Sequence, residues 1–382
     1  MKRVISILLV CVMLAGCMFM LGCSEKKSSA VIGIGGIGPL TGSTAKYGLS
    51  VKQGAEVAVE EINALGGLQF ELNFKDDVND EAKAQKAYGE LKDWGMQVLL
   101  GATTTEPCVT IADKADEDRV FTVTPSASAS EITEGHDNVF RVCYNDKGQG
   151  KVTANYIAAN ALSQGIAIIY KKGDAYSEGV YKAFKAECDR LELKVVSVTT
   201  FDSDGEKDFS SQIADAKEAG ADLLFLPIYY EPAARIIAQA DEMNFYPLIF
   251  GTDGIDGILT VEGFDKTLAE GVHLLTSVPS DYKNDRTRHF MESYQEKYGE
   301  MATQFAADAY DAVYAIYEAA KKAEVTADMS AEEMCDLLSK AMTEIELDGV
   351  TSRGSKLTWD STGEVKKDPI VVVIQNGNHV IK

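Results

Sequence analysis

Short apolar segments alternate along this chain with longer amphipathic segments, and this alternation restricts the fold more than any other feature. Apolar residues recur at helical spacing between the short segments, so each strand is followed by a helix. In the first half the predicted strands are Val31–Leu40, Phe70–Phe74, Val98–Leu100 and Val120–Val123, and the predicted helices are Ser50–Leu65, Glu81–Trp94 and Pro107–Ala115. Repeated strand–helix units predict a parallel sheet covered by helices on both faces.

The same pattern restarts near the middle of the chain. Predicted strands there are Gly165–Tyr170, Leu193–Thr199, Ala221–Leu226 and Leu248–Gly251, and predicted helices are Glu178–Leu191, Phe209–Glu218 and Pro232–Met243. The last third predicts helices Asp285–Tyr298, Ala302–Ala323 and Ala331–Met342 and the strand Ile370–Gln375. No flexible linker separates the halves. We therefore expect an α/β fold of two Rossmann-like lobes with parallel sheets, joined by crossing strands rather than by a tether.

The N-terminus has the pattern of a lipoprotein secretion signal. A basic Met1-Lys2-Arg3 head precedes the apolar run Val4–Gly22, which ends at Cys23 and a polar segment. We therefore predict a signal peptide over residues 1–22, lipidation of Cys23 and a tether over residues 23–30.

Cys17 is the alternative lipidation site, but cutting there would leave the apolar residues Met18–Leu21 on the tether. An uncleaved membrane helix is the alternative to cleavage, because about 19 apolar residues can just span a bilayer. The predicted location is extracytoplasmic, with a lipid anchor to the cell membrane.

Charge and cysteine content exclude two classes of function. The chain of 382 residues has a formal net charge of −22, which repels phosphate backbones and argues against nucleic-acid binding. Beyond the N-terminal segment the cysteines are Cys108, Cys143, Cys188 and Cys335. Their wide spacing, without a C-x-x-C pair, predicts neither a zinc site nor a redox motif, and leaves disulfide formation open.

Several motifs resemble catalytic signatures without their context. Gly33–Gly38 matches G-x-G-x-x-G, but its glycines lie within the first predicted strand instead of in a turn that opens a helix. Ser43-x-x-Lys46 lacks the companion motifs of penicillin-binding enzymes. Asp76, Asp77 and Asp80 are interpreted as a solvated loop. The histidines are isolated at positions His136, His273, His289 and His379. We predict no enzyme activity, no metal and no cofactor.

Polar and aromatic loops follow the predicted strands. Hydroxyl-rich loops at 101–107 and 124–130 follow strands of the first half, whereas Tyr229-Tyr230 and Asp253 follow strands of the second half. Ligands in open α/β sheets lie beyond the carboxyl ends of the strands. Hydroxyls and helix N-terminal amides suit a carboxylate, and an aromatic wall with one carboxylate suits an ammonium group. Together these loops predict an amino-acid site.

These loops belong to a longer series of short motifs. The series is Gly38-Pro39-Leu40-Thr41-Gly42, Tyr47-Gly48, Gly54-Ala55, Ile62-Asn63-Ala64-Leu65-Gly66-Gly67, Val123-Thr124-Pro125-Ser126-Ala127-Ser128, Lys207-Asp208-Phe209-Ser210 and Gly251-Thr252-Asp253-Gly254. In this order and spacing, from Gly33 to Ile381, the chain resembles the leucine/isoleucine/valine-binding protein family, the type I periplasmic solute-binding proteins of ABC importers.

The resemblance implies a set of ligand-binding residues. Thr105, Ser126 and Ser128 would hold the ligand carboxylate, Ser126 through its backbone. Tyr47, Tyr176 and Tyr229 would line the site, and Asp253 would pair with the ammonium group. Leucine-binding members carry Glu at the last position, so Asp keeps the charge with a shorter reach. The cysteine of a small disulfide in those members is replaced here by Thr104.

The resemblance also implies lobes that are discontinuous in sequence. We place the three crossovers near Val142–Asp146, Ser277–Asp281 and Lys366–Ile370. The N-terminal lobe is then 31–145 plus 277–368, and the C-terminal lobe is 146–276 plus 369–382. Ligand would bind an open form on the first lobe and favour closure by the second.

The implied function is binding of a branched-chain or similar amino acid by a monomeric protein. Its implied partners are an ABC permease and, through the lipid anchor, a membrane. Two alternatives stay open at this point. One is the same fold binding another small solute, such as an aromatic acid, an amide or a nucleoside. The other is a sensory module that passes its ligand state to a receptor.

Overall fold

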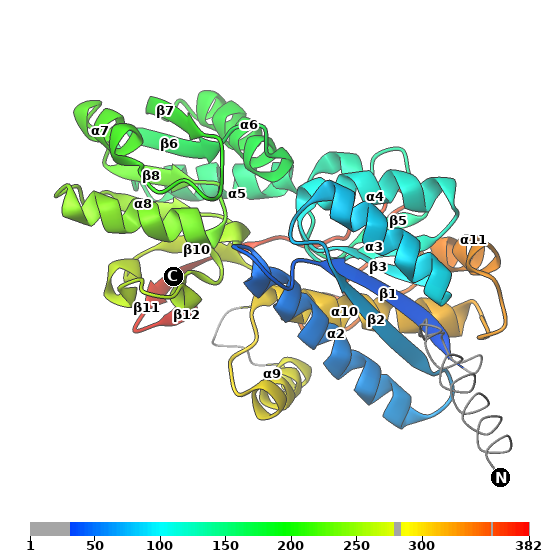
Figure 1. Ribbon diagram of the computed structural model, residues 1–382. Helices are drawn as coiled ribbons and strands as arrows, with labels where there is room; N and C mark the ends of the chain where they lie inside the picture. The colour runs from blue at the N-terminus through cyan, green and yellow to red at the C-terminus, as the bar shows by residue number, and fades with distance from the viewer. Residues whose placement is uncertain (1–30, 279–283, 353, 382) are drawn as a thin grey trace, which may run out of the picture.

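The computed structural model describes residues 31–278, 284–352 and 354–381. Its strands form two sheets, one in each of two lobes (Figure 1). The predicted signal peptide, both candidate lipidation cysteines and the whole of the tether lie outside the described residues. Within the described ranges, no helix combines the length and the apolar character needed to cross a bilayer.

The N-terminal lobe has a five-stranded parallel sheet of order β2-β1-β3-β4-β5. Its strands are β1 (Ile32–Gly38), β2 (Phe70–Asp76), β3 (Val98–Ala102), β4 (Phe121–Thr124) and β5 (Val139–Arg141). Its helices are α2 (Ala45–Leu65), α3 (Glu81–Trp94), α4 (Thr105–Glu117), α9 (Asp285–Tyr298), α10 (Gln304–Lys322) and α11 (Ala331–Met342).

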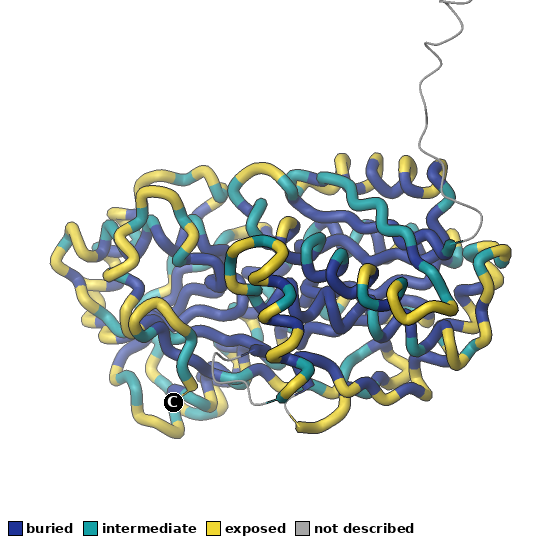
Figure 2. Tube along the Cα trace, turned by 90° about the horizontal axis from the view of Figure 1, so that it is seen from below, coloured by how far each residue is buried: buried dark blue, intermediate teal, exposed yellow. Residues whose placement is uncertain are grey.

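Side-chain alternation along these strands builds a core on each face of the sheet. In β3, Val98 and Leu100 belong to the core under α2 and α10, whereas Leu99 belongs to the core under α3 and α4. Helices therefore cover both faces, as the strand–helix alternation predicts. Figure 2 shows the result, with buried strands through the middle of the molecule and exposed segments at its periphery.

The C-terminal lobe has a seven-stranded sheet of order β12-β11-β10-β9-β8-β6-β7. Its strands are β6 (Ile166–Lys171), β7 (Val195–Phe201), β8 (Leu223–Leu226), β9 (Leu248–Gly251), β10 (His273–Thr276), β11 (Ile370–Gln375) and β12 (Asn378–Ile381). Its helices are α5 (Asp146–Ala159), α6 (Ala175–Arg190), α7 (Ser210–Glu218) and α8 (Tyr230–Glu242), with α5 packed on α6 and α7 on α8.

One strand of this sheet, β11, runs against the predicted parallel direction. β11 pairs with β10, and β12 with β11, in antiparallel fashion. The reason is the path of the chain, because β10 leads out of the lobe and β11 leads back into it beside β10. The hairpin from β11 to β12 turns at Asn376-Gly377, both with positive φ, and Asn-Gly is the usual signal of such a turn.

The chain passes between the lobes three times: after β5, after β10 and before β11. The two-lobed α/β architecture is as predicted, while the residue boundaries of the lobes stay a prediction. The second passage includes residues 279–283, which lie outside the described residues.

Some element predictions were wrong. β5, α5, β10 and β12 were missed, and four helices begin earlier than predicted: α2 at Ala45, α4 at Thr105, α6 at Ala175 and α8 at Tyr230. The first turns of these helices carry polar or aromatic residues instead of an apolar stripe, so periodicity missed them. As a consequence Tyr47, Thr105 and Tyr176 lie in first helical turns and not in loops.

The glycine-rich Gly33–Gly38 segment forms the interior of β1. A Cβ at Gly35 would lie 2.2 Å from the Met96 sulfur, and one at Gly36 would lie 2.2 Å from the Phe74 ring. These glycines make room for neighbouring side chains in the core, and no helix follows them directly. This geometry supports the structural interpretation of the motif over a dinucleotide-binding one.

Candidate functional site

A small pocket lies where the carboxyl ends of the two sheets face each other. Its lining comes from both lobes: Tyr47, Thr103, Thr104, Thr105, Ser126, Ser128, Tyr176, Tyr229, Asp253, Gly254 and Phe305. All seven residues predicted to bind ligand are in this lining. The structure therefore brings together residues that are up to 206 positions apart in the chain, between Tyr47 and Asp253.

The half of the pocket formed by the N-terminal lobe is built from hydroxyls at the start of α4. Thr105 is the first residue of that helix, and its Oγ1 accepts a hydrogen bond from the Ser128 N–H at 3.2 Å. The two hydroxyl oxygens, Thr105 Oγ1 and Ser128 Oγ, are 3.5 Å apart. The buried Thr104 Oγ1 has no hydrogen-bond partner among the described residues. Hydroxyls beside the free amides of a helix N-terminus form a site for an anion.

Ser126 lines this half of the pocket. Its hydroxyl donates a hydrogen bond to the Thr103 carbonyl at 2.5 Å, within the loops that follow β3 and β4. This bond uses the proton of the hydroxyl, so a donor to a ligand carboxylate would have to come from the Ser126 main chain. This is the role that the resemblance implies for Ser126.

The half formed by the C-terminal lobe carries one carboxylate, Asp253, just after β9. Its Oδ1 accepts a hydrogen bond from the Tyr176 hydroxyl at 2.8 Å, and its N–H donates to Gln149 Oε1 at 3.3 Å. Burial raises the pKa of Asp253 to about 7, although the hydrogen bonds from Tyr176 and Gln149 oppose this rise. No basic group is among the main influences on this carboxylate. A buried carboxylate without a counter-charge is costly, and a ligand cation would compensate it.

Aromatic rings form the walls between these two polar ends. The Tyr176 and Tyr229 rings are stacked with centroids 5.3 Å apart, and the Tyr47 ring lies 5.4 Å from Tyr229 and 4.8 Å from Phe305. The faces of these rings suit an apolar side chain or a neighbouring ammonium group. The pocket thus combines an anion site, a cation site and an apolar wall.

The lobes are closed on this pocket. The Tyr47 hydroxyl, from the N-terminal lobe, donates to the Gly254 carbonyl and accepts from the Tyr230 N–H at 3.2 Å. The Tyr230 hydroxyl in turn accepts from the Lys46 N–H at 3.3 Å. The space left in the pocket measures about 20 Å³, which is room for about one water molecule. A ligand the size of an amino acid enters only if the lobes separate or the rings move.

The prediction from sequence missed four lining residues: Thr103, Thr104, Gly254 and Phe305. Three of them lie in segments that the sequence had already indicated, the loop 101–107 and the motif Gly251–Gly254, but they were not assigned to the ligand. Phe305 had no such signal, because it lies in the first turn of α10, which the sequence indicates only as a core helix. Its place in the pocket depends on how α10 packs.

Other candidate chemistry is not assembled by the fold. Lys46 pairs with Glu300 at 2.7 Å, instead of acting on Ser43. Among residues 31–278, 284–352 and 354–381, no group of three or more His, Cys, Asp or Glu side chains could hold a metal ion. Cys108, Cys143, Cys188 and Cys335 are buried free thiols, so the disulfides left open by the sequence are not formed among them.

Known proteins resemble this chain over most of its length. A Leu/Ile/Val-binding protein homolog of Brucella melitensis is 33% identical over 309 residues, which cover 79% of this chain and 82% of that protein. A crystal structure of the leucine-binding protein LivK of Thermotoga maritima superimposes with a TM-score of 0.83 at 26% identity, covering 92% of this chain and 98% of that one. The branched-chain amino-acid substrate-binding protein LivJ of Streptococcus pneumoniae, solved with isoleucine, has a TM-score of 0.82 at 26% identity, covering 91% and 97%.

The periplasmic binding protein family matches residues 31–378, which include every strand from β1 to β11 and every residue that lines the pocket. The fold, the cleft between two lobes and the relatives agree with this match. The chain belongs to the periplasmic binding protein family.

Proposed function

We propose that this protein is the extracytoplasmic, lipid-anchored solute-binding component of an ABC importer, and that it binds a branched-chain or similar amino acid between its lobes. Members of its family bind solutes and are not enzymes. The relatives named above are leucine-, isoleucine- and valine-binding proteins, which supports this class of ligand. We expect the protein to act as a monomer that delivers its ligand to a membrane permease.

The observation that carries the proposal is the placement of a hydroxyl-lined helix N-terminus and one buried carboxylate at opposite ends of one pocket. Thr105 and Ser128, beside the start of α4, suit a carboxylate, and the uncompensated Asp253 suits an ammonium group. Between these ends lie only aromatic walls. A zwitterion with an apolar side chain meets all three requirements, whereas a simple acid or amine leaves one end of the pocket unpaired.

A titration with matched ligands tests the proposal. L-Leucine is compared by calorimetry with 4-methylpentanoate, which lacks only the amino group, and with 3-methylbutylamine, which lacks only the carboxylate. We expect L-leucine to bind and each truncated ligand to bind at least about 100-fold more weakly, because a buried partner is left unpaired. Equal binding of 4-methylpentanoate would instead favour an acid as the natural solute.

Variants of the protein provide the second arm of this test. Asp253→Asn should abolish binding of L-leucine, because it removes the charge that faces the ammonium group. Asp77→Asn is the matched control, since Asp77 is also buried with a pKa raised by burial, to about 6, but lies outside the pocket. Failure of every amino acid to bind, or full binding by Asp253→Asn, would refute the proposal.

The lipid anchor is tested separately. Metabolic labelling with a fatty acid should label the full chain, and Cys23→Ala should remove the label. Loss of the label in Cys17→Ala but not in Cys23→Ala would assign the anchor to the alternative site.

A further inference from the structure

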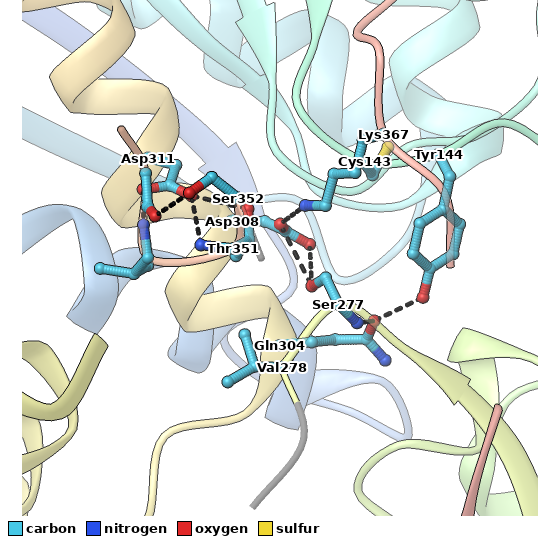
Figure 3. A network of polar contacts seen from close by, with 12 residues as sticks. Cys143, Tyr144, Ser277, Val278, Gln304, Asp308, Asp311, Thr351, Ser352 and Lys367 are labelled. Carbon is cyan, nitrogen blue, oxygen red and sulfur yellow. Dashed lines mark hydrogen bonds and ion pairs between the residues drawn. The ribbon is translucent and has the colours of Figure 1, made fainter. Parts of the chain in front are cut away.

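Two side chains near the start of α10 contact the three segments that connect the lobes (Figure 3). These segments, here called the crossovers, are residues 142–145, residues 277–278 and residues 366–369. The contacts come from two residues one helical turn apart, Gln304 and Asp308, here called the hinge clamp. Both side chains are buried, and neither lines the ligand pocket.

Gln304 holds the first two crossovers with a single side-chain oxygen. Its Oε1 accepts from the Tyr144 hydroxyl at 2.7 Å and from the Ser277 N–H at 3.2 Å. Its Nε2 donates to the Leu275 carbonyl at the end of β10, at 3.2 Å. Its own N–H donates to Asp256 Oδ2, in the C-terminal lobe, at 3.3 Å. Every polar group of this side chain is therefore tied to a crossover or to the opposite lobe.

Asp308 holds the second and third crossovers. Its carboxylate accepts from the Ser277 hydroxyl, at 3.2 and 3.3 Å to its two oxygens, and forms an ion pair with Lys367. Both side chains of that pair are only 3% exposed. Breaking a buried ion pair by removing one partner is strongly destabilising, so this contact resists separation of the third crossover from α10.

The helix that carries the clamp is fixed within the N-terminal lobe. α10 packs along α2, where a Cβ at Gly54 would lie 2.0 Å from the Ala306 carbonyl oxygen. When the lobes move apart, the crossovers must change their backbone angles beside a helix that does not move. Bonds from one rigid helix to all three crossovers then favour a concerted change over three independent ones.

We propose that Gln304 and Asp308 make the three crossovers bend as one unit, and that they set the balance between open and closed lobes without touching the ligand. They are positioning residues, and their effect on affinity rests on the proposed function. The structure is closed, with contacts from Gln304 to Leu275 and Asp256 in the opposite lobe. Loss of the side-chain contact to Leu275, while the backbone contact to Asp256 stays, should therefore favour opening and weaken ligand binding.

Hydrogen exchange of the empty protein tests the coupling without any ligand. Gln304→Ala removes contacts to the first two crossovers only. If the clamp couples all three, exchange should also become about tenfold faster in residues 366–369, which Gln304 does not contact. The double variant Asp308→Asn/Lys367→Met, which removes both partners of the ion pair, should in turn speed exchange in residues 142–145. Faster exchange confined to the crossover that lost its own bond would overturn the proposal.

Asp311→Asn is the matched control for these variants. Asp311 is a buried carboxylate on the same helix, but it accepts from Val350 N, Thr351 N and Thr351 Oγ1, which are not in a crossover. Its substitution should speed exchange near residues 350–351 and leave the crossovers unchanged. If it loosens the crossovers as much as Gln304→Ala does, the effect is general destabilisation and the proposal fails.

Titration with L-leucine measures the consequence for binding. Gln304→Ala should raise the Kd about tenfold, a usual size for coupling between distant sites, whereas Asp311→Asn should change it less than about twofold. If Gln304→Ala does not fold, Tyr144→Phe and Ser277→Ala each remove one contact and should give smaller changes in the same direction. If the wild-type protein does not bind L-leucine, the proposed ligand class is wrong, and hydrogen exchange still decides the coupling.

Discussion

At the scale of one residue, the proposed choice of ligand depends on the buried carboxylate of Asp253. The carboxylate is buried, it is held by Tyr176 and Gln149, and it lies in a lobe where it is not compensated by a cation. Burial raises its pKa to about 7, so protonation competes with an ammonium group near neutral pH. In the proposed function, the same residue therefore supplies affinity and makes that affinity dependent on pH.

We predict that L-leucine binds about tenfold more weakly at pH 6 than at pH 8. An ammonium group pairs with the ionised carboxylate, so binding is fully present above the pKa of about 7 and is lost as the pH falls through it. The ligand itself keeps both charges across this range. Calorimetric titration at pH 6, 7 and 8 measures the effect.

Two variants check that Asp253 is the group responsible. Tyr176→Phe removes a hydrogen bond that lowers the pKa of Asp253, so the midpoint of the pH profile should move to higher pH. Asp77→Asn removes another buried carboxylate with a raised pKa and should leave the profile unchanged. A wild-type Kd that is equal at pH 6 and pH 8 would contradict this assignment.

At the scale of elements, the site depends on where helices begin and how closely they pack. Tyr47, Thr105 and Tyr176 lie in the first turns of α2, α4 and α6, each of which follows a parallel strand. The pocket also needs Phe305, which α10 brings beside Tyr47 at 4.8 Å. α10 approaches α2 closely at Gly54. Glycine permits this approach because it has no Cβ to meet the Ala306 carbonyl oxygen.

We predict that Gly54→Ala destabilises the protein by about 1–3 kcal/mol, because the new Cβ would lie 2.0 Å from the backbone oxygen of Ala306. The helices must then separate, and this also shifts Phe305 relative to Tyr47. Urea unfolding measures the loss of stability, and titration with L-leucine should show weaker binding.

Gly89→Ala is the control, because Gly89 lies within α3 and a Cβ there meets no atom within 4 Å. Alanine has a higher helix propensity than glycine, so this variant should be up to about 1 kcal/mol more stable. An equal effect of the two substitutions would show that the contact between α2 and α10 is not responsible.

At the scale of the whole molecule, closure joins two lobes around a cavity of about 20 Å³. Tyr47 bonds directly to the opposite lobe at Gly254 and Tyr230. An amino acid cannot enter this form, so binding requires a more open one, and the ligand then stabilises closure through contacts to both lobes. Contacts of the ligand, of the aromatic residues and of the crossovers would thus all contribute to the free energy of closure.

We predict that saturating L-leucine lowers the radius of gyration of the empty protein by on the order of 1 Å, because the ligand shifts the population toward closed lobes. Small-angle X-ray scattering measures this change. Asp253→Asn should remove the response, since the ligand then lacks a partner in the C-terminal lobe. Identical scattering curves with and without bound L-leucine would contradict closure by the ligand.

The sequence by itself determined the local structure and most of the pocket's chemistry. α3, α9, α11 and β11 have the predicted ends. Their signals, apolar periodicity and residues that start or stop an element, depend only on neighbours a few positions away in the chain. All seven site residues that the family resemblance implied line one pocket. Within each lobe, parallel strands end at the same edge of the sheet, so the polar loops after those strands could be grouped before their distances were known.

Only the tertiary structure decided what depends on contacts between distant segments. The antiparallel β11 and β12, the entry of Phe305 into the pocket, the raised pKa of Asp253 and the two residues of α10 that hold three crossovers all have this origin. Burial and the approach of distant segments arise when lobes and helices pack, so no pattern within a short stretch of sequence records them.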